Sequence, residues 1–170
     1  MDAFEVVVEG AQPIPGEIRD KLLEPFITAA CTALREMAGV EVAVQGVYRK
    51  TLNHALGDIA AVIKLGSASE GFLVLGFPQR TAAALGGRIL AGVTPEVDEN
   101  LIRDCVGEIA NVVAGQAKAL LAGAPYRFAF SLPQVVMSAQ EFQPPPGLDA
   151  AVVAFCSEQG GFALQLFLKL

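Results

Sequence analysis

Apolar residues recur at helical spacing in two long stretches of the chain. In residues 17–37 they stand three or four positions apart, and Pro25 is expected to kink this helix or to begin its second part. Residues 97–121 form the second stretch, which starts among acidic residues that favour a helix N-terminus. Gly39 and Gly123 follow the two stretches, at the position where glycine commonly ends a helix. The pattern therefore predicts two long amphipathic helices.

The shorter apolar segments are typical of β-strands. We expect strands at 40–49, 58–65, 72–77, 128–137, 150–156 and 162–168, and a short helix at 78–90. Pro133 places the fourth strand at a sheet edge or a bulge, because proline cannot donate a hydrogen bond to a β-ladder. Glycine-containing turns at 66–71 and 157–161 predict two hairpins.

The same order of elements occurs twice along the chain. Residues 71–77 align with residues 161–167 at an offset of 90. We interpret 1–170 as a single domain made of two helix-strand-strand-strand units, at about 17–92 and 95–170. This duplication predicts an α/β fold with six strands, which the two hairpins make largely antiparallel. A chance similarity between two apolar hairpins is the alternative.

Composition narrows the class of protein. The 170 residues are 53% hydrophobic and only 18% charged, with a net charge of −6. Such a chain can bury enough apolar surface to fold, but it has no run of the roughly 18 to 20 apolar residues that span a membrane. The acidic balance disfavours nucleic acid as a partner, since phosphate contacts need a basic face. Without a signal-peptide pattern at the N-terminus, we expect a cytoplasmic protein that binds neither membrane nor nucleic acid.

Familiar catalytic groups are scarce in this chain. His54 is the only histidine, so a His-based metal site is excluded, and no nucleophile elbow or phosphate-binding glycine loop is present. The three cysteines, Cys31, Cys105 and Cys156, are far apart and form no CxxC pair. Cys105 is expected to be a small buried residue, although a redox role is conceivable.

The second long helix carries the most informative polar pattern. At about 100° per residue, one narrow stripe contains Asp104, Glu108, Asn111, Gly115 and Lys118. Asparagine is a poor helix former, and its amide can donate and accept hydrogen bonds at once, which suits the binding of a water molecule. An ordinary solvated helix face is the alternative, and the pattern alone leaves both interpretations open.

Residues 104–111 also carry a resemblance to a known family. They read Asp-Cys-Val-Gly-Glu-Ile-Ala-Asn and fit the D/S-xxx-E-xx-N motif of the CheC/CheX/FliY chemotaxis phosphatases. The segments 24–27, 58–78 and 115–121 look similar as well, so the resemblance, which is strongest to CheX, covers nearly the whole chain. It implies an α+β layered sandwich with internal pseudo-two-fold symmetry, in which the long helices lie against the six-stranded, largely antiparallel sheet.

The resemblance implies a phosphatase that hydrolyses the aspartyl phosphate of a CheY-like response regulator in chemotaxis signalling. Asn111 would orient the attacking water, Glu108 would pair with the regulator's lysine, and Asp104, Gly115 and Lys118 would support them. No cofactor of its own is expected, because the regulator would supply Mg²⁺. Phosphoryl transfer needs mainly positioning and charge stabilisation, so a chain without a nucleophile or metal could still catalyse it.

The two units differ at the position that matters for this chemistry. Glu24 aligns with Glu108, but Ile27 stands where the second unit has Asn111, so we expect one active site per chain. The resemblance also implies a homodimer formed through sheet edges. The alternative function is a non-catalytic module that docks a response regulator or another two-component signalling protein, for which Asn111 would be dispensable.

Overall fold

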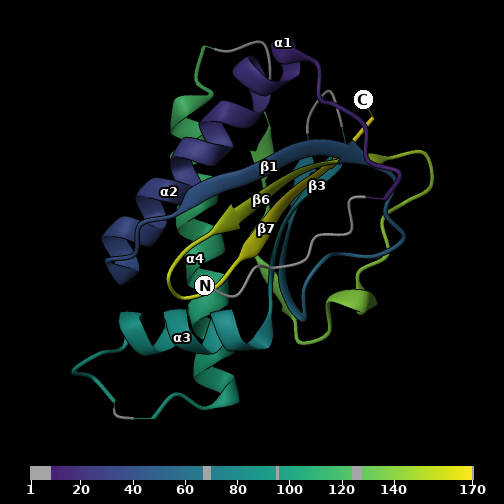
Figure 1. Ribbon diagram of the computed structural model, residues 1–170. Helices are drawn as coiled ribbons and strands as arrows, with labels where there is room; N and C mark the ends of the chain where they lie inside the picture. The colour runs from purple at the N-terminus through teal and green to yellow at the C-terminus, as the bar shows by residue number, and fades with distance from the viewer. Residues whose placement is uncertain (1–8, 67–69, 95, 124–127, 170) are drawn as a thin grey trace.

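A computed structural model of the chain describes residues 9–66, 70–94, 96–123 and 128–169. Helices cover one face of an open antiparallel sheet (Figure 1). The helical elements are α1 (Gly16–Ile18), the π-helical turn η1 (Arg19–Leu23), α2 (Glu24–Ala38), α3 (Gln79–Ile89), α4 (Glu99–Leu120) and the 3₁₀ turn η2 (Ala139–Glu141). The strands are β1 (Ala43–Lys50), β2 (Ile59–Gly66), β3 (Gly71–Phe77), β4 (Ala129–Phe130), β5 (Gln134–Val136), β6 (Asp149–Cys156) and β7 (Phe162–Leu168).

The first predicted helix changes its hydrogen-bonding pattern near its proline. α1, η1 and α2 follow one another without a break, since Ile18, Leu23 and Glu24 at their junctions all have helical φ and ψ. Pro25, the second residue of α2, has no N–H to donate to the preceding turn, and the change from π-helical to α-helical pairing falls at this position. Gly39 ends α2 in the left-handed conformation, with φ at 64°, and its N–H donates to the carbonyl oxygen of Arg35. The second, α-helical part therefore begins beside Pro25, as expected, but within one continuous helix.

The sheet has seven strands, one more than expected. Its order is β1-β6-β7-β3-β2-β4, and β5 also pairs with β2. The extra strand arises because the predicted strand at 128–137 is divided into β4 and β5 on either side of Pro133. Both short strands lie at the sheet edge, where a residue without an N–H donor is tolerated. The α/β class and the antiparallel sheet are confirmed.

The centre of the sheet is the antiparallel pair β3 and β7. Phe72 of β3 faces Phe167 of β7. At the predicted offset of 90, Phe72 is equivalent to Phe162 and Phe167 is equivalent to Phe77. The equivalent pair, Phe77 and Phe162, is also in contact, with stacked rings whose centroids are 5.1 Å apart. A two-fold relation between the units requires this register. The duplication itself remains a prediction, with which the register agrees.

Both faces of the central strands are covered. On one face α2 and α4 lie side by side over the sheet (Figure 1), and the stacked rings of Phe155 and Phe162 lie in the core beneath the helices. On the other face the connecting segments 51–58 and 137–148 pack on the sheet, with Phe142 between Phe72 and Phe167. Strands buried on both faces explain why the chain is so rich in apolar residues.

The loop 51–58 approaches the sheet at a buried amide. Gln165 of β7 is fully buried, and its Oε1 accepts a hydrogen bond from the backbone N–H of Leu56 at 2.8 Å. A Cβ at Gly76 would overlap the carbonyl oxygen of Leu56. Glycine at this position therefore lets the loop pack directly on the strand.

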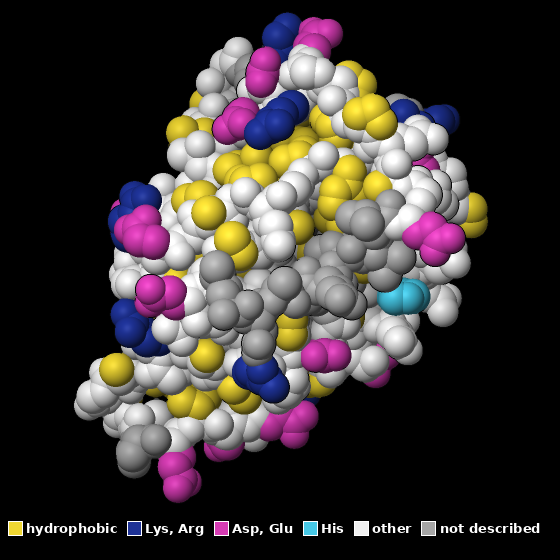
Figure 2. Space-filling model, viewed as in Figure 1, with side chains coloured by type: hydrophobic (Ala, Val, Ile, Leu, Met, Phe, Trp, Pro, Cys, Tyr) yellow, Lys and Arg dark blue, Asp and Glu magenta, His cyan; other side chains and the backbone are white. Residues whose placement is uncertain are grey.

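Figure 2 shows apolar side chains gathered in the upper middle of one face, with charged side chains scattered around them.

Within the described ranges, no helix is both long enough and apolar enough to cross a membrane.

Candidate functional site

The polar stripe lies on a well-anchored helix. Asp98 caps α4, because its Oδ1 accepts a hydrogen bond from the N–H of Leu101 at 2.8 Å. The opposite face of α4 is buried against α2, α3 and the sheet, and includes Ile109 and Val113. The helix therefore presents its exposed side chains from a fixed backbone.

The structure places all five predicted site residues on the exposed side of α4. Asp104, Glu108, Asn111, Gly115 and Lys118 are each exposed, as their helical spacing predicts. Within the part of the chain that the structure describes, no hydrogen bond or ion pair engages the side chains of Glu108 and Asn111. A carboxylate and an amide one turn apart are thus free to bind water or a partner's cation.

Three of these residues line one open groove. Asp104, Glu108 and Asn111 form its helical wall, and the opposite wall comes from the sheet edge at Leu132 and Pro133. The groove has a volume of about 580 Å³. It is therefore a cleft between a helix and a strand edge, and its two walls are about twenty residues or more apart in the sequence.

Sequence reasoning missed most of the residues that complete this groove. They are Arg103, Gly107, Leu132, Pro133 and Val135, of which only Pro133 drew attention, as a mark of an edge or bulge. A Cβ at Gly107 would lie 3.3 Å from Cγ2 of Val135, so glycine allows α4 to approach β5 closely. A glycine in the middle of a long helix indicates that another element packs closely there, but it does not identify the strand.

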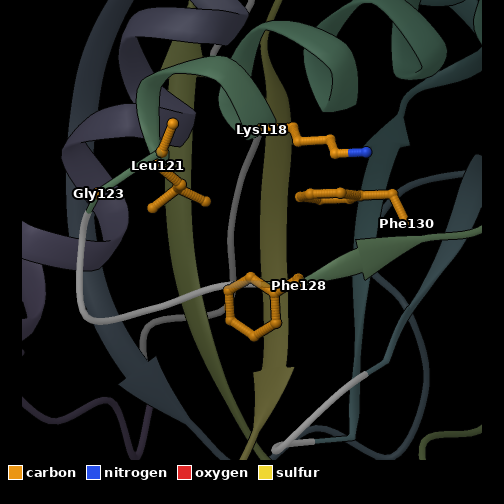
Figure 3. Close-up of a pocket in the computed structure, with 6 residues that line it drawn as sticks. Lys118, Leu121, Gly123, Phe128 and Phe130 are labelled. Atoms are coloured by element: carbon orange, nitrogen blue, oxygen red, sulfur yellow. The ribbon is translucent and has the colours of Figure 1, made fainter.

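Lys118 and Gly115 lie apart from this groove. Lys118 lines a second hollow near the end of α4, together with Leu121, Phe128 and Phe130. Figure 3 shows its side chain extending beside the ring of Phe130. A Cβ at Gly115 would meet no atom within 4 Å, so this position is open. The five residues share a helix face but not a pocket.

Cys105 points away from the groove into the protein. It is buried, and its Sγ lies near Gly86 of α3. Burial raises the pKa of the Cys105 thiol, and the neighbouring charge of Asp104 raises it further. The thiol is therefore protonated at neutral pH, which makes it a poor nucleophile, and its packing agrees with the expected small buried residue.

The equivalent positions in the first unit have no such site. Ile27 is buried, with 7% of its surface exposed, whereas Asn111 is exposed. Glu24 lies near a cation of its own, since its Oε1 is 3.7 Å from Nε of Arg19. Of these two aligned positions, both in the described chain, only the one in α4 therefore presents an unengaged carboxylate and amide together.

The groove offers binding and orienting groups rather than a nucleophile. In the described ranges, no cluster of three or more His, Cys, Asp or Glu side chains could hold a metal ion. Asn111 can accept from and donate to a water molecule, and the two carboxylates can attract a cation. The chemistry that this arrangement can perform is the placement of water beside a positively charged partner surface.

Comparison with protein families finds a match to the chemotaxis phosphatase CheX over residues 59–156, which is more than half of the chain. No curated protein matches the sequence significantly.

Solved structures of similar fold include the chemotaxis protein CheX from Desulfovibrio desulfuricans, with a TM-score of 0.78 and 27% identity over 89% of this chain and 99% of that chain. CheX from Vibrio vulnificus has a TM-score of 0.73 and 26% identity, covering 86% of this chain and 97% of the other. A chain of the CheX-CheY-BeF3-Mg²⁺ complex from Borrelia burgdorferi shares the fold, with a TM-score of 0.68 and 19% identity over 87% and 97% of the two chains.

Proposed function

Because this chain belongs to the CheX family of chemotaxis phosphatases, we propose that it hydrolyses the aspartyl phosphate of a CheY-like response regulator. The observation that carries the proposal is the pair Glu108 and Asn111, which is exposed, unengaged by the described residues, and set in an open groove on a rigid helix. The motif that suggested the family lies inside the matched range.

In the proposed reaction, Asn111 holds a water molecule in line with the phosphorus atom. The water oxygen attacks phosphorus, the bond from phosphorus to the aspartyl oxygen breaks, and the products are a free carboxylate and inorganic phosphate. The amide of Asn111 fixes the direction of attack and lowers the entropic cost of ordering the water. The regulator would bring Mg²⁺ to neutralise the developing charge, so this chain needs no metal of its own.

Glu108 has the role of orienting the partner. Its carboxylate would pair with the regulator's lysine next to the phosphoryl group, which sets the position of Asn111 relative to phosphorus. Asp104, one turn earlier on the same wall, adds to the negative potential that attracts this lysine. A CheX of the same fold has been solved in complex with CheY, which supports a partner of this class. Such a partner would place the protein in the cytoplasm.

The test is phosphatase turnover by the wild type and the Asn111→Ala variant on a phosphorylated CheY-like regulator. We expect Asn111→Ala to lower kcat by about 100-fold or more, since misplacement of a reacting group by about 1 Å costs that much. Asn100→Ala is the matched control, because Asn100 is an exposed asparagine in the first turn of the same helix. Its turnover should equal that of the wild type.

Two results would contradict the proposal in different ways. Normal turnover in Asn111→Ala would refute the water-positioning mechanism. Tight binding of a beryllofluoride-activated regulator by a wild-type protein that shows no turnover would instead favour the non-catalytic docking module.

A further inference from the structure

The sheet edge opposite Asn111 contains a β-bulge. On one side of it Leu65 of β2 faces Phe130 of β4, and on the other side Val62 of β2 faces Gln134 of β5. Three steps along β2 therefore correspond to four steps along the partner, so the segment 131–133 contains one extra residue. A bulge of this kind redirects side chains and is frequent beside functional sites.

The bulge is held firmly at its first residue. Ser131 donates its N–H to the carbonyl oxygen of Lys64 at 3.0 Å, and its Oγ accepts from the N–H of Lys64 at 2.8 Å. Pro133 then restricts the backbone before β5 resumes pairing. The segment between these two anchors has a defined position, although it contributes no strand of its own.

Leu132 occupies the extra position and projects from the protein. It is 83% exposed, the most exposed large hydrophobic residue of the described chain, and it lines the groove opposite Asp104 and Glu108. A single exposed leucine needs no explanation by itself. This one, however, is presented by an anchored bulge in the groove that also contains Asn111.

We propose that Leu132 is a docking residue that binds an apolar side chain next to the phosphorylation site of a CheY-like receiver domain. This inference rests on the proposed function, because it assigns the second wall of the same groove to the same partner. The receiver's lysine would lie against the acidic helical wall, and its apolar neighbour would lie against Leu132 and Pro133.

The charge of the groove favours a receiver domain over a second copy of this chain or an anionic membrane. The groove has two carboxylates, Asp104 and Glu108, and one cation, Arg103, and the whole chain has a net charge of −6. A second copy of this chain or an anionic membrane would bring further negative charge to these carboxylates. A surface that offers both a lysine and an apolar side chain matches both walls.

The experiment compares three variants in binding and in turnover. Leu132→Ser removes the apolar contact, Leu132→Met restores its bulk, and Val93→Ser is the matched control, since Val93 is 77% exposed but does not line the groove. Binding is measured with a CheY-like receiver domain loaded with beryllofluoride and Mg²⁺. Turnover is measured with the same receiver in its phosphorylated form.

We expect Leu132→Ser to raise Kd and KM by about 10-fold, which is typical of losing a central apolar contact, while kcat stays within about 2-fold. Leu132→Met and Val93→Ser should remain within about 2-fold of the wild type in both constants. Thermal unfolding should be unchanged in all three variants, because the substituted side chains are exposed.

Unchanged Kd and KM in Leu132→Ser would overturn the inference, as would an equal loss in Val93→Ser. A fall in kcat alone would assign Leu132 to the chemical step, and a changed mass in light scattering would assign it to self-association; either result also overturns it. Binding separates this inference from the catalytic proposal, because Asn111→Ala should lose turnover but keep its Kd. A wild-type protein that does not bind the receiver would refute both.

Discussion

The carboxylate of Asp149 accepts hydrogen bonds from Arg49 in β1 and from Thr51, the residue directly after β1. Its Oδ2 accepts from Nε and Nη2 of Arg49 at 3.0 and 2.8 Å, and its Oδ1 accepts from Oγ1 of Thr51 at 2.9 Å. The hydrogen bonds from Thr51 and Arg49 lower the pKa of Asp149, despite an opposing effect of burial. A carboxyl whose folded pKa is lowered stabilises the protein above its unfolded pKa, and this stabilisation is lost as the pH falls below about 4.

We therefore expect Asp149→Asn to reduce the free energy of unfolding at pH 7 by about 0.5 to 1 kcal/mol, a value limited by partial exposure of the pair. The difference from the wild type should shrink at pH 3, which lies below the ordinary pKa of an unfolded aspartate, so that the stabilisation due to the lowered pKa is already being lost. Urea unfolding at the two pH values measures both quantities. Glu158→Gln, at an exposed carboxylate, should change stability by less than about 0.5 kcal/mol, and an equal effect of the two variants would contradict the assignment.

Single residues also mark how far the site could be predicted. Glu108 and Asn111 were identified because their spacing on one helix and their motif are properties of a short stretch of sequence. Leu132 could not be, since an isolated leucine before a proline has no periodicity and its groove partner is 21 residues away in the sequence.

The packing of the loop 51–58 on strand β3 depends on Gly76. We expect Gly76→Ala to lower the free energy of unfolding by about 3 kcal/mol, because the added Cβ would overlap the carbonyl oxygen of Leu56 and displace the loop from the sheet. Urea unfolding gives this difference directly. This loss of stability is at the upper end of the range for overpacking substitutions, because the backbone at Leu56, and not a flexible side chain, must move.

A second glycine in the neighbouring element α3 provides the control. Gly87 is exposed, and a Cβ there would meet nothing within 4 Å. Gly87→Ala should therefore stabilise the protein by about 0.5 to 1 kcal/mol through the higher helix propensity of alanine. If the two glycine variants changed stability equally, close approach of the loop would not be the reason for Gly76.

For the molecule as a whole, we predict a homodimer. The groove lies at the β4–β5 edge of the sheet, so β1 is the edge left for a second copy, and residues 129–170 contain only four charged residues. Apolar surface also gathers on the face in Figure 2. Light scattering at micromolar concentration should give twice the chain mass of 17.8 kDa, and a mass of one chain would contradict the prediction.

Local properties of the sequence were sufficient for the helices, the hairpins and the polar stripe of α4. Apolar periodicity, end-capping glycines and the position of Pro25 act within a few residues, so they can be read without knowing what packs nearby. The family resemblance, which the CheX match confirms, likewise rests on short stretches of sequence, of which residues 104–111 are the most specific.

The tertiary structure decided what stands next to that stripe. Alternation within a strand does not specify which strand pairs with it or where the register shifts, because ladder partners are distant in the chain. Only folding places the bulge at 131–133 opposite Asn111, puts Lys118 in a different hollow, and covers the second sheet face with loops. The sequence alone therefore determined the helical wall of the groove, and the sheet pairing determined the wall that faces it.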